Sequence, residues 1–331
     1  MQTAEEPRDS LEYRDVRSLT VRRYEPGRVL TGFSALVYLD MSGIGLALIP
    51  TEVTTLVRLK TLLAKNNQLQ DTSLPKGFGS LKALQTLNLA GNQFLTIPPP
   101  VLDLEGLREL FLGGNRIRSI PSAIARLSKL EDLYLGGNEI CTVPEEISSL
   151  GNLRRLVLCA NHIQSIPPEL ANLSNLRALS LHNNCLSFLP REILALVKLQ
   201  ELSLRGNPLV IRFARKAAFA APPSLLELAG RTIHLACLVT SPGTLPPHLL
   251  SYLASARSCP NPKCSGVYFE ACVRRMRFVD FCGKFRLPLM QYLCSPCCLP
   301  PPSPPSTSPS DSDSDQEPPV PAERLQKVLL G

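Results

Sequence analysis

The chain has 331 residues, of which 44% are hydrophobic and 19% charged, and its formal net charge is +7. The basic residues are dispersed and are not interleaved with aromatic side chains, so the composition does not favour a nucleic-acid-binding protein. Residues 1–32 carry many charges and no apolar run, and no stretch approaches the length of a membrane span, so we expect neither a signal peptide nor a membrane protein.

After a lead-in of residues 1–32, which we expect to be flexible, the middle of the chain repeats the pattern L-x-x-L-x-L-x-x-N. Successive copies are 23 residues apart, except for a step of 25 after the second, and they begin at Leu36, Leu59, Leu84, Leu107, Leu130, Leu153, Leu176 and Leu199. A fixed period of this length is typical of a solenoid with one short strand per repeat. We therefore predict an α/β leucine-rich repeat solenoid of eight repeats, a horseshoe, over residues 33–213.

One repeat illustrates the physical logic. Leu133 and Leu135 alternate in a strand and point into the core, whereas Tyr134 between them points outward. Asn138 ends the strand, and its side-chain amide is suited to a ladder of hydrogen bonds to neighbouring backbone groups. The first repeat has Ile44 in place of this asparagine, and Pro208 directly follows the last one, as expected of edge repeats.

The outward strand positions line the concave face and predict a binding surface for a protein cargo. An apolar stripe of Phe111, Tyr134 and Val157 occupies its centre. Charged or polar residues surround the stripe, and we name as its candidate rim Glu109, Asp132, Arg155, His182 and Arg205. An aromatic centre with a charged rim is typical of a protein-binding hot spot. The alternative is that the aromatic residues only stiffen the sheet.

Residues 214–256 lack the repeat and contain two short motifs. Ser224 and Glu227 form a capping box, and the helix they predict carries on one face Leu225, Leu228, Ala229, Thr232 and Ile233. This face resembles the elongin-binding box (BC-box) of cullin-type ubiquitin-ligase receptors, with Leu225, Ala229 and Ile233 at the motif positions and Leu228 beside them. The alternative is an amphipathic helix that caps the solenoid.

A second motif follows the first and resembles the cullin-selecting box of SOCS-box proteins. Its candidate cullin-binding residues are Leu245, Pro246, Leu249, Tyr252 and Leu253. The Tyr-Leu ending favours cullin 5, although Thr244 stands where the fuller cullin 5 motif has a proline. The looser cullin 2 pattern, aliphatic-Pro-x-x-aliphatic, is also met.

Residues 257–299 are rich in cysteine. Two cysteine groups about 30 residues apart, separated by turn-forming residues, suit a tetrahedral structural zinc ion, and the candidate ligands are Cys259, Cys264, Cys294 and either Cys297 or Cys298. No histidine lies in this segment, so the site would be all-thiolate and closed, which does not suit catalysis. We interpret Cys272 and Cys282 as buried strand residues. The alternative is that all these cysteines are free buried thiols or a palmitoylation cluster.

The remaining features concern the tail and the cellular compartment. Residues 300–331 are rich in proline, serine and aspartate, which predicts disorder, and the last residues from Glu323 suit one or two helical turns. Cys141, Cys159 and Cys185 stand singly in the repeats, without the disulfide caps of secreted solenoids, so we expect a reducing compartment, cytoplasmic or nuclear.

Several stretches together resemble the leucine-rich repeat-containing protein 58 family, over roughly residues 55–299 and the extreme C-terminus. They include Leu179-Ser-Leu-His-Asn-Asn184, Cys259-Pro-Asn-Pro-Lys-Cys264 and Phe278-Val-Asp-Phe-Cys-Gly283. The resemblance implies an intracellular receptor subunit of a cullin ligase. The last cysteine pair of the family matches Cys294 and Cys298, which favours Cys298 over Cys297 as a ligand.

These observations lead to a functional hypothesis and one alternative. The hypothesis is a non-catalytic substrate-recognition subunit of an elongin–cullin RING ubiquitin ligase, with elongins B and C, cullin 5 (or cullin 2) and a protein substrate as partners. The alternative is a leucine-rich repeat scaffold, for example in small-GTPase signalling. An enzyme is not favoured, because the chain has no nucleophile–base pair, no phosphate-binding loop and only four scattered histidines.

Overall fold

The computed structural model describes residues 16–21, 33–209, 218–219, 222–236, 238, 245–281, 285–299 and 327–329. The chain forms two compact units. The first, here the solenoid unit, comprises Met1–Ser187, Glu192–Pro208 and Pro321–Gly331. The second, here the C-terminal unit, comprises Phe188–Arg191 and Leu209–Val320.

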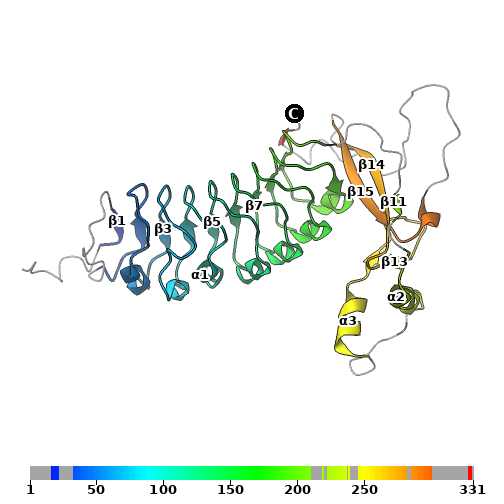
Figure 1. Ribbon diagram of the computed structural model, residues 1–331, viewed down its shortest axis with the longest axis horizontal. Coiled ribbons are helices and arrows are strands. Elements are labelled where there is room, and N and C mark those ends of the chain that lie inside the picture. The colour runs from blue at the N-terminus through cyan, green and yellow to red at the C-terminus, as the bar shows by residue number, and fades with distance from the viewer. Residues whose placement is uncertain are drawn as a thin grey trace, which may run out of the picture. The chain divides into compact units, whose positions relative to one another are not determined.

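The solenoid unit is built on a ten-stranded parallel sheet with the order β1-β2-β3-β4-β5-β6-β7-β8-β10-β16 (Figure 1). Its eight repeat strands coincide with the predicted ones: β2 (Tyr38–Asp40), β3 (Thr61–Leu63), β4 (Thr86–Asn88), β5 (Glu109–Phe111), β6 (Asp132–Tyr134), β7 (Arg155–Val157), β8 (Ala178–Ser180) and β10 (Glu201–Ser203). The register pairs each strand with the same position of the next, as Phe111 with Tyr134 and Tyr134 with Val157. The predicted leucine-rich repeat solenoid is therefore confirmed.

Short helices follow the strands along the side of the solenoid unit opposite the sheet (Figure 1). Most are single 3-10 turns: η2 (Thr51–Thr55), η3 (Phe78–Ser80), η4 (Ser122–Arg126), η5 (Glu145–Ser149), η6 (Pro168–Asn172) and η7 (Arg191–Ala195), with one α-helix, α1 (Pro99–Leu102). Pro144 at the N-cap of η5 sets the extended backbone before the turn, and Ile147 and Leu150 are fully buried. The convex side thus closes the core with the residues expected from the repeat.

The predicted asparagine ladder runs through the solenoid. Asn138 donates from Nδ2 to the carbonyls of Leu112 (3.0 Å) and Leu135 (2.9 Å), and its Oδ1 accepts from the amide of Ile117 (3.0 Å). The same arrangement recurs in the other repeats, at Asn67, Asn92, Asn115, Asn161, Asn184 and Asn207. Each side chain therefore satisfies backbone groups of its own and the preceding repeat, which fixes the stacking distance.

Two strands lie where the sequence predicted none. Ser18–Thr20, within the lead-in expected to be flexible, forms β1 and pairs with β2. Lys327–Leu329, within the tail expected to be disordered or helical, forms β16 and pairs with β10. Both lie at open edges of the sheet, where unpaired N–H and C=O groups accept any extended segment whatever its side chains. Backbone pairing of this kind leaves no repeat signature in the sequence.

The C-terminal unit contains a four-stranded sheet in the order β11-β14-β15-β9. Its centre is a hairpin of the nine-residue strands β14 (Val273–Phe281) and β15 (Phe285–Leu293), flanked by β11 (Ala218–Phe219) and β9 (Leu189–Pro190). A second, two-stranded sheet joins β12 (Arg257–Ser258) to β13 (Val267–Tyr268). The helical elements are α2 (Leu225–Leu235), α3 (Pro247–Ala254) and η8 (Pro296–Cys298). The segments predicted as 214–256 and 257–299 thus fold as parts of one unit.

Candidate metal centre, partner-binding helix and concave face

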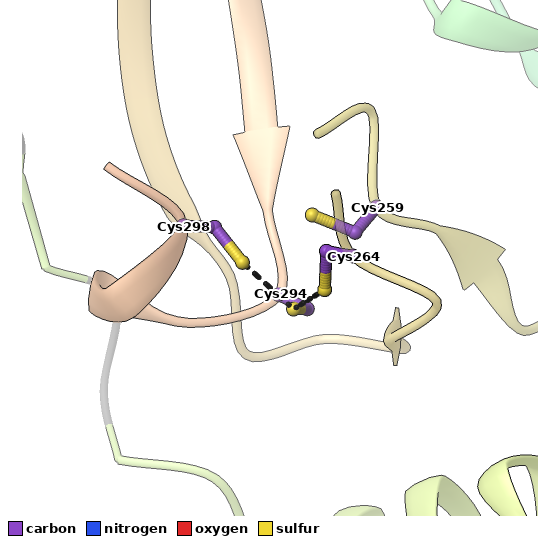
Figure 2. A group of neighbouring side chains, drawn as sticks. All are labelled: Cys259, Cys264, Cys294 and Cys298. Carbon is purple, nitrogen blue, oxygen red and sulfur yellow. Dashed lines mark hydrogen bonds between the residues drawn. The ribbon is translucent and has the colours of Figure 1, made fainter. Parts of the chain in front are cut away.

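Four cysteines of the C-terminal unit converge on one point, although they come from three places in the chain (Figure 2). Their sulfur atoms all lie within 4.8 Å of one another. Cys259 and Cys264 flank the turn between β12 and β13, Cys294 directly follows β15, and Cys298 ends η8. The Sγ of Cys294 lies 3.5 Å from the Sγ of Cys264 and 3.5 Å from that of Cys298.

These distances fit a tetrahedral metal ion. Four thiolates at about 2.3 Å from a zinc ion are about 3.8 Å from one another. Cys259 is buried and packs with Val273 and Leu293, whereas Cys264, Cys294 and Cys298 are half-buried. The set is the one predicted with Cys298, and Cys297 is exposed and outside it. Cys272 is half-buried and lies just before β14, so it is not a strand residue as expected, and Cys282 lies outside the described residues.

Backbone turns shape the cluster. The amide of Gly266 donates to the Sγ of Cys264 (3.2 Å), and its carbonyl accepts from the amide of Cys259 (2.8 Å). A Cβ at position 266 would lie 2.8 Å from the Sγ of Cys294 and 3.1 Å from the Sγ of Cys264. Only glycine therefore lets the backbone pass this close to the sulfurs, a requirement that the sequence analysis did not identify.

The thiols differ in acidity. Burial raises the pKa of Cys259 and that of Cys294, and neighbouring thiols raise the pKa of Cys294 further. Burial also acts to raise the pKa of Cys298, but hydrogen bonds from Ser295 and the neighbouring thiols outweigh it and lower the value to about 7. Crowded thiols of this kind hold protons that a divalent cation would displace on binding.

The helix α2 begins where the sequence predicted, but its leucine side chains face solvent and its charged Glu227 is buried. Ser224 is the N-cap and its Oγ accepts from the amide of Glu227 (3.1 Å). Leu225 is 85% exposed and Leu228 is 46% exposed, whereas Glu227 is only 1% exposed. Ala229 is also exposed and Ile233 is half-buried. The predicted motif face is therefore open to solvent at Leu225, Leu228 and Ala229, while Glu227 on the opposite face is buried.

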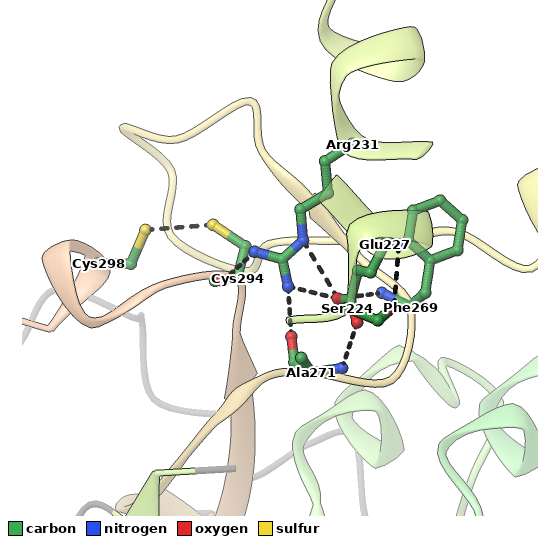
Figure 3. A network of polar contacts seen from close by, with 7 residues as sticks. All are labelled: Ser224, Glu227, Arg231, Phe269, Ala271, Cys294 and Cys298. Atoms are coloured by element: carbon green, nitrogen blue, oxygen red, sulfur yellow. Dashed lines mark hydrogen bonds and ion pairs between the residues drawn. The ribbon is translucent and has the colours of Figure 1, made fainter. Parts of the chain in front are cut away.

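The buried face of α2 carries a network that the sequence analysis missed (Figure 3). The Glu227 carboxylate accepts from the amides of Phe269 (3.2 Å) and Ala271 (2.7 Å) and from the Nε of Arg231 (3.1 Å). The Nη1 of Arg231 donates to the carbonyl of Cys294 (2.8 Å). The Glu227 side chain thus does not accept from the backbone amide of Ser224, as a capping box requires. The i,i+4 spacing of Glu227 and Arg231 was the feature of the sequence that could have predicted their ion pair.

The helix α3 packs on the same part of the unit. The ring of Tyr252 stacks on Phe269 with centroids 4.5 Å apart, and the Nε2 of His234 lies 3.0 Å from the carbonyl of Leu253. Among the cullin-box residues, Pro246 is exposed, Leu245, Leu249 and Tyr252 are half-buried, and Leu253 is buried. The first part of the motif is therefore accessible, and the last part holds the two helices together.

The concave face brings its predicted residues together. The rings of Phe111 and Tyr134 stack, and the Nη1 of Arg155 donates to the hydroxyl of Tyr134 (2.7 Å). Arg155 also pairs with Asp132 at 3.5 Å. Burial raises the pKa of Asp132, as does the nearby Glu109, although Arg155 opposes this. The stripe and this part of its rim therefore form one contact network.

The other end of the concave face is more polar. The Nδ1 of His182 lies 3.1 Å from the Oγ of Ser180 and 3.3 Å from the Oγ of Ser203. These side chains and Glu201 line a shallow depression on β8 and β10. Arg205 is exposed beside it. The small side chains here leave room for a partner next to the aromatic stripe.

Comparisons with known proteins agree with this fold. A family model described as "Leucine-rich repeat region" matches residues 15–166, and one described as "Leucine rich repeat" matches residues 151–209. Leucine-rich repeat-containing protein 58 of Mus musculus is 70% identical over 307 residues, covering 91% of this chain and 84% of the mouse protein. The Homo sapiens protein is 69% identical over 313 residues, covering 92% and 84%.

The chain belongs to the leucine-rich repeat-containing protein 58 family. The similarity extends to amphibians, because the Xenopus laevis member is 65% identical over 303 residues, covering 92% of this chain and 85% of that protein. The covered share of the chain exceeds what the repeats alone occupy, so the similarity to the family also includes residues of the C-terminal unit.

Among solved structures, the solenoid resembles the one titled "Crystal structure of a TDR receptor". It is 33% identical, with a TM-score of 0.52, over 58% of this chain and 35% of that one. Leucine-rich repeat domains generally bind protein partners, so membership of this family supports a protein-interaction scaffold. Within the described residues, no helix is both long and apolar enough to span a bilayer.

Proposed function

We propose that this chain is the substrate-recognition subunit of an elongin–cullin RING ubiquitin ligase. The observation that carries the proposal is the inverted polarity of α2, whose leucines face solvent while Glu227 is buried. A helix that only closed its own domain would bury its apolar face. An amphipathic helix that exposes this face suits docking into the groove of a partner.

The elongin-binding role falls to the exposed face of α2. Leu225 is 85% exposed, and burying such a side chain in a partner's pocket contributes about 1.5–3 kcal/mol. Ala229 is small and exposed, which allows a partner helix to approach closely. Leu228 and Ile233 lie on the same face of α2. Leu225, Ala229 and Ile233 match the motif that elongin C binds, and Leu228 lies beside them.

The cullin-binding role falls to the start of α3. Leu245, Pro246 and Leu249 are at least partly accessible there, and they satisfy the short cullin 2 pattern. Tyr252 and Leu253, which favour cullin 5, pack against α2 and Phe269 and so set the angle between the two helices. We rank cullin 5 first and cullin 2 second.

The cysteine cluster has a structural role in this proposal. A single zinc ion held by Cys259, Cys264, Cys294 and Cys298 would join the turn between β12 and β13 to the end of β15. The four protein ligands fill a tetrahedral shell and leave no position for substrate. The ion would therefore stabilise the unit that presents α2, in a non-catalytic protein of the cytoplasm or nucleus.

The substrate would be a protein held on the concave face. The stacked Phe111 and Tyr134, with Val157 beside them, offer an apolar centre, and a charged rim surrounds it. Glu109, Asp132 and Arg155 form the rim at the stripe, and His182 and Arg205 extend it along the face. Partly desolvated aromatic centres with polar rims carry most of the affinity in protein interfaces.

A titration of purified full-length protein with the elongin B–elongin C complex tests the proposal. We expect one-to-one binding by isothermal titration calorimetry, weakened at least 100-fold in a Leu225→Ala/Ala229→Phe double variant. Leu95→Ala, which removes an exposed leucine of the solenoid unit, is the matched control and keeps the wild-type affinity. Absence of binding by the wild type would refute the elongin link.

The concave face also supports a second candidate, a non-enzymatic scaffold for a signalling complex such as one built on a small GTPase. Its stacked aromatic stripe needs no ligase to bind a protein. This alternative predicts a nucleotide-dependent partner on the concave face and no elongin in the complex. The same titration therefore separates the two functions.

A further inference from the structure

We propose that the metal centre controls the elongin-binding helix through Arg231. In this view, a bound metal fixes the backbone of Cys294. Arg231 on α2 donates a hydrogen bond to that backbone, and this bond keeps the apolar face of α2 exposed. Loss of the metal releases the helix. The consequence for elongin rests on the function proposed above, whereas the coupling between metal and helix stands on the contacts alone.

Arg231 is placed to connect α2 with the backbone of the cluster (Figure 3). Its guanidinium donates to the Glu227 carboxylate on the preceding turn of α2, to the carbonyl of Ala271, and to the carbonyl of Cys294. Only 15% of its side chain is exposed. A planar guanidinium with five fixed donors joins three acceptors from separate segments, which a lysine cannot do.

Glu227 makes the removal of Arg231 destabilising. Its side chain is 2% exposed, and burial raises its pKa, but hydrogen bonds from Arg231, Ala271 and Phe269 outweigh burial and lower the pKa. The carboxylate therefore stays charged in the interior. Removing one partner of a buried charge pair leaves the other without compensation, which is strongly destabilising.

The same network reaches the cluster by a second route. The segment from Cys264 to Ala271 is held at its start by the cluster and at its end by Glu227, which accepts from the amides of Phe269 and Ala271. Gly266 within this segment lies against the cysteine sulfurs. Movement of the thiolates therefore displaces both anchors of α2, the Cys294 carbonyl and the 264–271 segment.

Besides these anchors, few contacts hold α2, chiefly the one between the Nε2 of His234 and the carbonyl of Leu253 in α3. α2 has 11 residues, and isolated helices of that length are marginal in water. Glu227 and Gly230 are its buried residues, and Gly230 offers only its backbone to the ring of Phe269. Since the leucines face solvent, they do not stabilise the helix until a partner covers them. The order of α2 thus depends mainly on the polar anchors Arg231 and Glu227, whose partners the cluster positions.

Hydrogen exchange of the full-length chain tests the coupling without elongin. We expect that stripping zinc with a chelator accelerates amide exchange in 225–235 at least 10-fold, while the amides of the solenoid repeats are unchanged. Arg231→Gln should give a similar acceleration while still holding one zinc per chain by elemental analysis. Stripping zinc from this variant should add less acceleration than it does in wild type, because only the route through the 264–271 segment is left to be lost.

Matched variants complete the design. Arg118→Gln, which removes an exposed ion pair of the solenoid, should leave exchange in α2 unchanged. Arg231→Lys keeps the charge and is expected to fall between wild type and Arg231→Gln, which guards against loss of folding in the latter. Elongin affinity should fall at least 10-fold in stripped wild type and in Arg231→Gln.

Three outcomes would overturn the coupling: slow exchange of α2 after zinc removal, slow exchange of α2 in Arg231→Gln, or no zinc bound by the wild type. Failure of the receptor function looks different. In that case zinc-loaded wild type would not bind elongins, while the exchange of α2 would still respond to zinc and to Arg231.

Discussion

The rings of Phe111 and Tyr134 stack with centroids 4.6 Å apart and planes 16° apart, on neighbouring strands of the concave face. The hydroxyl of Tyr134 accepts from Arg155, whose guanidinium carbon also lies 5.9 Å from the centre of the tyrosine ring. The aromatic stripe and its charged rim are thus already ordered without a partner, so binding would cost little entropy for ordering these side chains.

Replacing both rings, Phe111→Ala/Tyr134→Ala, should remove cargo binding. We expect the proteins captured by wild type in quantitative affinity purification to fall at least 10-fold, because aromatic anchors dominate such interfaces. Leu95→Ala, an exposed leucine outside the repeat strands, serves as the control and should keep the captured set. An unchanged set with the double variant, provided it folds, would show that cargo binds elsewhere.

Gly266→Ala should weaken metal binding. The new methyl group would lie 2.8 Å from the Sγ of Cys294, so this sulfur or the backbone at position 266 must shift. We expect at least a 10-fold loss of zinc affinity in competition with a chromophoric chelator. Gly151→Ala is the matched control, since a Cβ at that position meets nothing within 4 Å. Equal affinity of the two variants would contradict a metal site at the cluster.

The asparagine ladder predicts that replacing a buried asparagine of the solenoid by alanine lowers the free energy of unfolding much more than replacing an exposed one. Asn138→Ala leaves the buried amide of Ile117 without its partner and removes one of the two side-chain donors from each of the carbonyls of Leu112 and Leu135, so it should lower the free energy of unfolding by about 1–3 kcal/mol. Asn152, which is exposed, bonds only the Ser128 carbonyl, and its replacement by alanine should cost less than about 0.5 kcal/mol. Urea unfolding followed by circular dichroism compares them.

The buried carboxylate of Glu227 predicts a pH dependence of known sign. Its pKa in the folded chain lies below the ordinary value of 4.5, so its contribution to stability is complete above that pH and is lost as the pH falls through the folded pKa. Glu227→Gln should therefore be less stable than wild type at neutral pH, by about 3–5 kcal/mol. Thermal unfolding at stepped pH should show this gap closing below pH 4.5. A gap that widens in acid would contradict the assignment.

Much of the solenoid was predictable because the same stabilising contacts recur in each repeat. The alternation of Leu133, Tyr134 and Leu135 fixes which side chains face the core, and Asn138 recurs with the same backbone partners in each repeat. The edge strands β1 and β16 escaped prediction because they pair through backbone groups alone. Local side-chain patterns carry no information about such pairing.

The candidate sites divide in the same way. Spacing and residue type were enough to group Cys259 and Cys264 with Cys294 and Cys298, and to place the N-cap of α2 at Ser224. The direction in which α2 faces was not predictable, because it depends on Phe269 and Ala271, which are 42 and 44 residues from Glu227. Contacts between distant segments decide orientation, whereas periodicity within a helix does not.

The central claim is most directly tested by affinity purification from cells of wild type beside the Leu225→Ala/Ala229→Phe double variant, scored by mass spectrometry for elongins B and C and each cullin. We expect wild type to bring down both elongins and one cullin, cullin 5 ahead of cullin 2, and the double variant to lose all three while keeping the concave-face cargo. Wild-type protein that captures cargo but neither elongin would contradict the receptor function and favour the scaffold.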